Sequence, residues 1–203
     1  MHVSERTPFR GVLPTVPGED EIWAGTYSDR TDLIEVTIPE GIRRVGDMAF
    51  SFCTNLEKVT LPSTLEEIDI GSFERCTALK EVVLPLSLKY INHSAFSECV
   101  SLESVWFAEG LEGVAPYAFA YCPRLTSVYL PHSLKELEED AFKGCTSLHA
   151  VCLPTSLVDT CFIAFDGCPV LRVLPIPPPP APPPPRPSLG NPFADNPSLR
   201  NSQ

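Results

Sequence analysis

The chain has 203 residues and a mass of 22.3 kDa, which suffices for one domain with a continuous hydrophobic core. Its 26 acidic and 15 basic side chains give a formal net charge of -11. Such a charge repels phosphate backbones and anionic headgroups, which argues against nucleic acid and membrane surfaces as partners. Neither a signal-peptide-like run in residues 1–20 nor a membrane-spanning segment is apparent, so we expect a cytoplasmic protein without membrane insertion.

The first two segments of the chain differ in their periodicity. Residues 1–20 show little hydrophobic pattern and contain Pro8, Pro14 and Pro17, which favours a flexible N-terminal arm. Residues 21–32 carry two side chains in phase with the sequence that follows. Ile22 and Tyr27 each lie 23 residues before an apolar counterpart, at Val45 and Phe50. We therefore expect a degenerate half-coil over 21–32 that caps the next segment.

From residue 33 onward the sequence repeats with a period of 23 residues. Cysteine recurs at Cys53, Cys76, Cys99, Cys122, Cys145 and Cys168. Phenylalanine recurs at Phe50, Phe73, Phe96, Phe119, Phe142 and Phe165, and leucine at Leu33, Leu56, Leu79, Leu102, Leu125, Leu148 and Leu171. We call each set of recurring positions a column and each repeat a coil. Six complete coils and the start of a seventh are predicted over residues 33–174.

Each coil reads L-x-x-V-x-L-P-x-x-L-x-x-I-x-x-x-A-F-x-x-C-x-x. The first part alternates buried and exposed positions as a short strand does, and the proline ends that strand. The second part is a helical or turn-like return. A coil buries about seven side chains worth ~1.5–3 kcal/mol each, whereas ordering its backbone costs ~1–2 kcal/mol per residue. One coil cannot fold alone, so neighbouring coils must stack into a solenoid with a parallel sheet.

This unit resembles the BspA-like (Treponema pallidum type) leucine-rich repeat, in which an Ile-Pro or Leu-Pro strand precedes Ala-Phe-x-x-Cys-x-x-Leu. The resemblance implies a leucine-rich-repeat solenoid with short parallel strands on its concave face and short helical or turn segments on its convex face. It also implies a surface or scaffold protein that binds other macromolecules. It brings no catalytic residues and no shared ligand.

Two coils depart from the pattern. The fourth replaces the strand-ending proline with Ala108, and the sixth places Thr160 in a column that is otherwise apolar. We expect both coils to deviate locally, with a one-residue register shift around Thr160.

The repeat stops in a proline-rich stretch over residues 175–190. Prolines at 177–180 and 182–185 lack backbone donors and favour polyproline II, at about 3.1 Å per residue. This stretch is either a semi-rigid spacer or a ligand for a polyproline-binding domain. Residues 191–203 repeat the spacing of the Phe column imperfectly, through Phe193, Asn196 and Leu199, and form either a partial capping repeat or a disordered tail.

The cysteine columns favour packing over chemistry. A metal site needs converging ligands, often from C-x-x-C pairs, and the sequence contains no such pair. A cysteine that recurs in every coil is more simply a small buried residue at a turn. Cys152 and Cys161 lie outside this column and stay unexplained, as does the spacing of His149 to Cys152. We predict no metal and no cofactor.

The outward-facing strand column is the predicted binding surface. It contains Thr37, Thr60, Val83, Trp106, Tyr129 and Cys152. Large aromatic side chains at exposed strand positions are common anchors of protein interfaces, although cross-strand packing that steadies the sheet is an equal alternative. The predicted ligand-binding residues are Trp106, Tyr129, Val83, Lys80, Glu81, Glu103 and Cys152.

The function predicted from these features is a non-enzymatic protein-protein interaction module or scaffold that uses the concave sheet. The histidines fall in no nucleophile or metalloprotease motif, and repeat positions spread reactive groups along a surface instead of gathering them in a pocket. The alternative is a cell-surface or secreted adhesin that recognises glycans or matrix components. The sequence leaves the partner's identity and the oligomeric state open.

Overall fold

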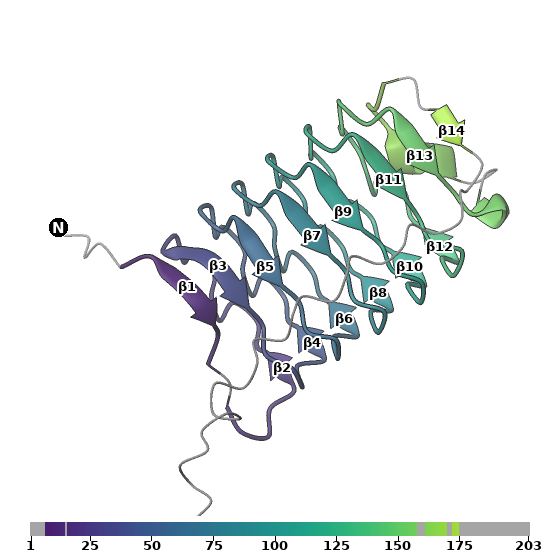
Figure 1. Cartoon of the computed structure of the whole chain (residues 1–203). Coiled ribbons are helices and arrows are strands. Elements are labelled where there is room, and N and C mark those ends of the chain that lie inside the picture. The colour runs from purple at the N-terminus through teal and green to yellow at the C-terminus, as the bar shows by residue number, and fades with distance from the viewer. Residues whose placement is uncertain (1–6, 15, 158–160, 170–171, 175–203) are drawn as a thin grey trace, which may run out of the picture.

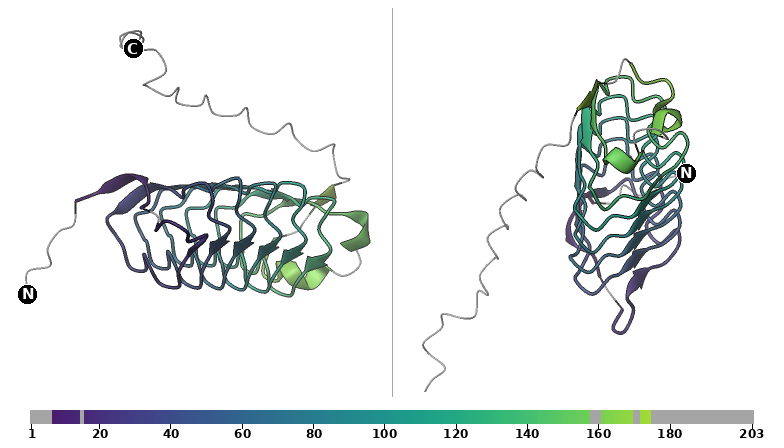
Figure 2. Two further views of the ribbon diagram at one scale, coloured as in Figure 1. Left: turned by 90° about the horizontal axis from the view of Figure 1, so that it is seen from below. Right: turned by 90° about the vertical axis from the view of Figure 1, so that its right-hand side faces the viewer.

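The structure is a computed structural model, and it describes residues 7–14, 16–157, 161–169 and 172–174. The chain winds into a solenoid in which each coil lies against the next (Figure 1). Viewed along its axis, the coils superimpose into one flattened outline (Figure 2). Each regular coil contributes one strand to each of two rows, and all pairings are parallel. The leucine-rich-repeat solenoid predicted from the 23-residue period is confirmed.

The first row, which we call the long-strand sheet, consists of the strand predicted at the start of each coil. Its members are β1 (Phe9–Val12), β3 (Leu33–Thr37), β5 (Lys58–Thr60), β7 (Glu81–Val83), β9 (Ser104–Trp106), β11 (Ser127–Tyr129), β13 (Ala150–Cys152) and β14 (Arg172–Leu174). Hydrogen bonds join β1 to β9 in one ladder and β11 to β14 in another. The 23-residue register holds from β3 onward, as in the pairing of Val36 with Val59.

The second row, which we call the short-strand sheet, was not predicted. It contains β2 (Glu21–Ile22), β4 (Arg44–Val45), β6 (Glu67–Ile68), β8 (Tyr90–Ile91), β10 (Gly113–Val114) and β12 (Glu136–Leu137). Each strand has two residues, so no alternating pattern is long enough to announce it. The remainder of the return consists of turns, as expected. Helices are rare, and those described are the 3₁₀ turns η1 (Thr155–Leu157) and η2 (Cys161–Phe165) of the sixth coil.

The amino-terminal segment differs from the predicted flexible arm. Phe9–Val12 forms β1, which pairs with β3 through a register irregularity after Phe9. Leu13 follows this strand and is buried. The expectation of a flexible arm is wrong here because an edge strand gains a ladder of hydrogen bonds from β3. Residues 21–32 are accordingly the second part of a complete coil, and the predicted cap is more than a half-coil.

A ladder of aromatic side chains fills the core. The ring of Tyr27 stacks on Phe50, as the column predicted, and the stack continues through Phe73, Phe96, Phe119, Phe142 and Phe165 with centroid separations of 5.1–5.3 Å. The valine and leucine columns of the long strands pack in the same core. Because each ring contacts one ring in each neighbouring coil, stability accumulates coil by coil.

The return of each coil depends on residues with positive φ. Met48 and Phe52 have φ angles of 53° and 59°, and Tyr117 and Tyr121, at the same positions of a later coil, have angles of 58° and 57°. Gly144 takes the place of Phe52 in the fifth coil with φ of 67°, where an added Cβ would lie 2.8 Å from the Tyr121 ring. A left-handed residue other than glycine costs about 1–2 kcal/mol, so the stacked core must offset that strain.

The irregular coils behave in two ways. In the fourth, which carries Ala108, the ladder is interrupted between β9 and β11, although these strands remain neighbours. This agrees with the expected local deviation. In the sixth, the short strand is replaced by 3₁₀ turns, while Thr160 and its proposed register shift lie outside the described residues. The predictions for 175–190 and 191–203 lie outside them as well.

Candidate functional site

The candidate site lies on the outer surface of the long-strand sheet. Val83, Trp106 and Tyr129 each occupy the last position of a strand, on β7, β9 and β11. Alternation along the strand turns the preceding valine into the core and leaves these three side chains outside. Val83 pairs with Trp106 in register, and β9 contacts β11. The three side chains therefore form one row across neighbouring strands.

The row is accessible to a partner. Trp106 is 41% exposed and Tyr129 is 43% exposed, which is a large apolar area for a surface position. Leu86 lies three residues beyond Val83 and is the most exposed large apolar side chain of the described residues. We call Val83, Leu86, Trp106 and Tyr129 the aromatic patch. The sequence interpretation missed Leu86, although it stands in a column that otherwise holds Glu40, Ser63, Glu109 and His132.

The charges beside the patch change along the solenoid. Arg10 forms an ion pair with Glu35, and the same register continues to Lys58 and Glu81 with alternating sign. At β9 the alternation stops, because Ser104 pairs with Glu81 in register. The next members of this column are Ser127 on β11 and Ala150 on β13. The outer surface is thus self-neutralised at its amino-terminal half and uncharged beside the aromatic side chains.

The predicted charged residues border the patch and do not enter it. Lys80 lies 4.0 Å from Glu57, and Glu103 lies 3.3 Å from Arg124, all on exposed side chains outside the strands. Exposed pairs of this kind contribute about 0–1 kcal/mol. Glu81 is exposed at the first position of β7. Lys80 and Glu103 are already paired within the chain, so they are better placed to orient a partner than to anchor it.

Cys152 does not belong to the accessible surface. Its backbone pairs with Tyr129 on one side and with Leu174 on the other, and its short side chain is completely buried. Burial raises the pKa of this thiol above 9.0. The prediction that Cys152 contacts a ligand is therefore wrong, because a strand position that faces outward is still covered when its side chain is small and strands lie on both sides.

The recurring cysteines have a uniform packing role. The described cysteines are free thiols, and the six of the column each donate a hydrogen bond from Sγ to a backbone oxygen of the preceding coil. Cys99, for example, lies 3.2 Å from the carbonyl oxygen of Phe73. Burial raises the pKa of the Cys53 and Cys99 thiols to about 12. A protonated, buried thiol is a poor nucleophile and a poor metal ligand at neutral pH.

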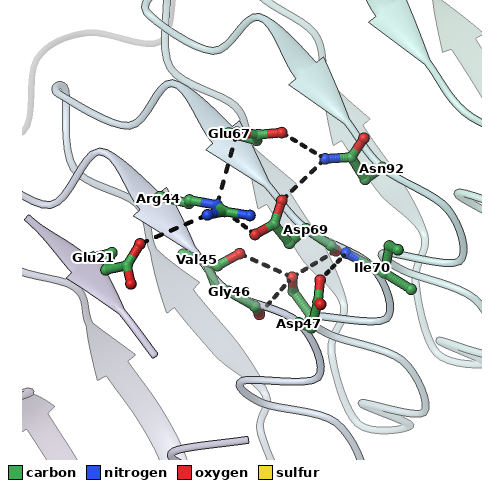
Figure 3. A network of polar contacts seen from close by, with 10 residues as sticks. Glu21, Arg44, Val45, Gly46, Asp47, Glu67, Asp69, Ile70 and Asn92 are labelled. Atoms are coloured by element: carbon green, nitrogen blue, oxygen red, sulfur yellow. Dashed lines mark hydrogen bonds and ion pairs between the residues drawn. The ribbon is translucent and has the colours of Figure 1, made fainter. Parts of the chain in front are cut away.

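A polar network on the short-strand sheet has a structural role (Figure 3). The Nε of Arg44 lies 2.6 Å from Oδ2 of Asp69, and Arg44 also faces Glu21 and Glu67 at 3.8 Å each. Asn92 donates to Glu67 at 2.9 Å and to Asp69 at 3.1 Å. Burial raises the pKa of Asp69, while the Arg44 guanidinium opposes that shift. The network holds four neighbouring coils in register and leaves its central cation fully engaged.

Metal clusters and membrane-spanning helices are both absent from the described residues. Within them, no group of three or more His, Cys, Asp or Glu side chains is arranged to hold a metal ion. The same part of the chain contains no helix with the length and apolar character needed to cross a membrane.

Comparison with known proteins supports the repeat assignment. The model of the BspA type leucine rich repeat region matches in six copies, over residues 20–149 and 112–179. A leucine-rich repeat protein of T. pallidum is 29% identical with a TM-score of 0.50, covering 70% of this chain and 57% of that one. The pneumococcal vaccine antigen PcpA is 26% identical with a TM-score of 0.61, covering 75% of this chain and 42% of that one. A comparison with curated protein sequences gives no match.

Proposed function

This chain belongs to the BspA-type leucine-rich repeat family, and we propose that it is a non-enzymatic module that binds a protein partner through the aromatic patch. Proteins of this family are generally protein-binding or adhesin-like, and leucine-rich repeat solenoids are typically non-enzymatic. The chain spans 57% and 42% of the two solved proteins described above, so the partner must be argued from its own surface.

The observation that carries this proposal is the local change in the long-strand sheet at β9. Elsewhere on the sheet, charges of opposite sign face one another across strands, which stabilises the solenoid and leaves little for a partner. At β7, β9 and β11 the outer positions instead hold Val83, Trp106 and Tyr129. Uncharged small residues beside exposed aromatic anchors are the composition of the core of a protein interface.

The alternative role, cross-strand packing, fits the contacts less well. Ring stacking in this molecule is regular, and every step of the Phe column is a ring contact. Among the aromatic contacts of the described residues, none involves Trp106 or Tyr129. Side chains that steadied the sheet would contact each other across β9 and β11, where the ladder is interrupted. Their exposure is better explained by a partner.

The test is affinity capture with the intact chain and a double variant. Trp106→Ala with Tyr129→Ala removes both anchors, whereas Thr37→Ala with Thr60→Ala alters the same column at β3 and β5 and serves as the control. We expect the native chain and the control to capture the same protein, and the double variant to lose it while keeping the native circular dichroism spectrum. Equal capture by all three chains would overturn the assignment of the site.

A second candidate function is recognition of glycans or matrix components at a cell surface. The similarity to the pneumococcal vaccine antigen PcpA favours it, because that relative is an antigen of a bacterium. Both functions use the aromatic patch, since aromatic rings also stack on sugars. A glycan array and a panel of matrix proteins, probed with the same three chains, distinguish them. Binding to glycans that depends on Trp106 and Tyr129 would favour this candidate over a protein partner.

A further inference from the structure

The amino-terminal end of the solenoid contains an apolar pocket far from the aromatic patch. It encloses about 250 Å³ and is lined by Leu13, Pro14, Val16, Glu19, Glu21, Ile22, Trp23, Thr26, Tyr27, Pro39 and Ile42. Tyr27 ends the aromatic stack of the core, and Trp23 beside it is 57% exposed. Val16 on the rim is exposed as well. We call this cavity the end pocket, and its wall is the uncovered end of the hydrophobic core.

The end pocket also carries a carboxylate without a cation. Of its two acidic residues, Glu21 faces Arg44 at 3.8 Å. Glu19 forms no ion pair within the described part of the chain. Aromatic and proline side chains beside an acidic rim are the chemistry that recognises polyproline II with a basic residue, because proline packs on aromatic faces and arginine pairs with carboxylate. The pocket therefore suits a proline-rich ligand that contains arginine.

The chain itself contains such a sequence. Residues 177–180 and 182–185 are two runs of four prolines, and Arg186 stands between Pro185 and Pro187. A sequence of this kind favours polyproline II, which loses little conformational entropy on binding. Along the sequence, its arginine lies at the far end from β14, the last described strand.

The geometry brings this segment to the end pocket. All strands of the long-strand sheet are parallel and in register, so the chain leaves β14 at the same edge of the sheet where Val12 of β1 leads into Leu13 of the pocket. Four strand steps separate β1 from β9, one step leads to β11 and two more reach β14. At about 4.8 Å per step the two ends lie ~34 Å apart.

The length of the segment matches that distance. From residue 175 to Arg186, polyproline II at about 3.1 Å per residue spans ~37 Å. We propose that residues 177–187 of this chain run back along the sheet edge and bind in the end pocket, with Arg186 facing Glu19. This contact covers the exposed end of the core and leaves the aromatic patch free.

Trp23 is the reporter for the test. Trp106→Phe in the full-length chain leaves Trp23 as the sole tryptophan, and acrylamide quenching measures its accessibility. Arg186→Glu should raise the quenching constant, with a two- to five-fold shift in the ratio of docked to free segment, about the range that a surface ion pair gives. Glu19→Arg should do the same, and the two substitutions together should restore protection because the charges are exchanged.

The matched control is Arg200→Glu, which makes the same change of charge beyond the proline-rich stretch. It should leave Trp23 quenching unaltered. The proposal is overturned if Arg186→Glu has no effect, if Arg200→Glu has an equal effect, or if the double exchange fails to restore protection in chains with native circular dichroism. Protection that rises with protein concentration would also overturn it, since the segment would then be binding a second copy.

Discussion

The buried thiols make the stability of the solenoid sensitive to alkaline pH. Burial raises the pKa of Cys99 to about 12, compared with 9.0 for an unperturbed thiol. Because the raised value belongs to the folded state, the stabilisation is fully present below pH 9 and is lost as the pH rises from 9 towards 12. At pH 10 the unfolded chain has released most of this proton while the folded chain retains it. Each such thiol then lowers the free energy of unfolding by ~1.4 kcal/mol relative to pH 7.

Urea unfolding at pH 7 and pH 10 with a reductant present measures this effect. Cys99→Ala removes one titrating thiol, so its free energy of unfolding should fall by ~1.4 kcal/mol less than that of the native chain between the two pH values. Val105→Ala is the control, since it removes buried apolar volume in the next coil without a titrating group and should retain the native pH dependence. An identical pH dependence for Cys99→Ala and the native chain would refute the role assigned to burial.

Three further substitutions test individual contacts, each by urea unfolding. Phe96→Ala removes a fully buried ring and should cost about 3–5 kcal/mol; a loss below about 1 kcal/mol would contradict the stacked core. Arg44→Ala leaves the buried Asp69 carboxylate without its cation and should cost about 1–3 kcal/mol, of which Asp69→Asn in the same chain recovers part. Gly144→Ala should cost about 1–2 kcal/mol from its positive φ alone, and more with Tyr121 present than in a Tyr121→Ala background.

The periodicity of the sequence predicted the long-strand sheet and the core because both depend on columns that repeat in every coil. The Phe column became a ring stack, and Ile22 and Tyr27 fell into the predicted columns. The short-strand sheet escaped prediction because its strands have two residues each. β1 escaped because its register irregularity after Phe9 breaks the 23-residue spacing on which the prediction relied.

The candidate site could be predicted in part. Trp106 and Tyr129 were recognised because aromatic residues at outward strand positions are unusual, and the structure places both on the surface. Accessibility of a small side chain depends on its neighbours, so the burial of Cys152 could not be read from its column. The end pocket depends on how β1, the loop after it and β2 pack together, and no repeating column describes that contact.

The central claim is that the aromatic patch binds the partner, and an equilibrium binding isotherm with the captured protein tests it most directly. Truncating an interface hot spot costs at least about 2 kcal/mol, which corresponds to a ~30-fold weaker Kd. We predict at least this loss for Trp106→Ala with Tyr129→Ala and a Kd within about two-fold of native for Thr37→Ala with Thr60→Ala. Equal Kd values for the native chain and the Trp106 and Tyr129 variant would contradict the claim.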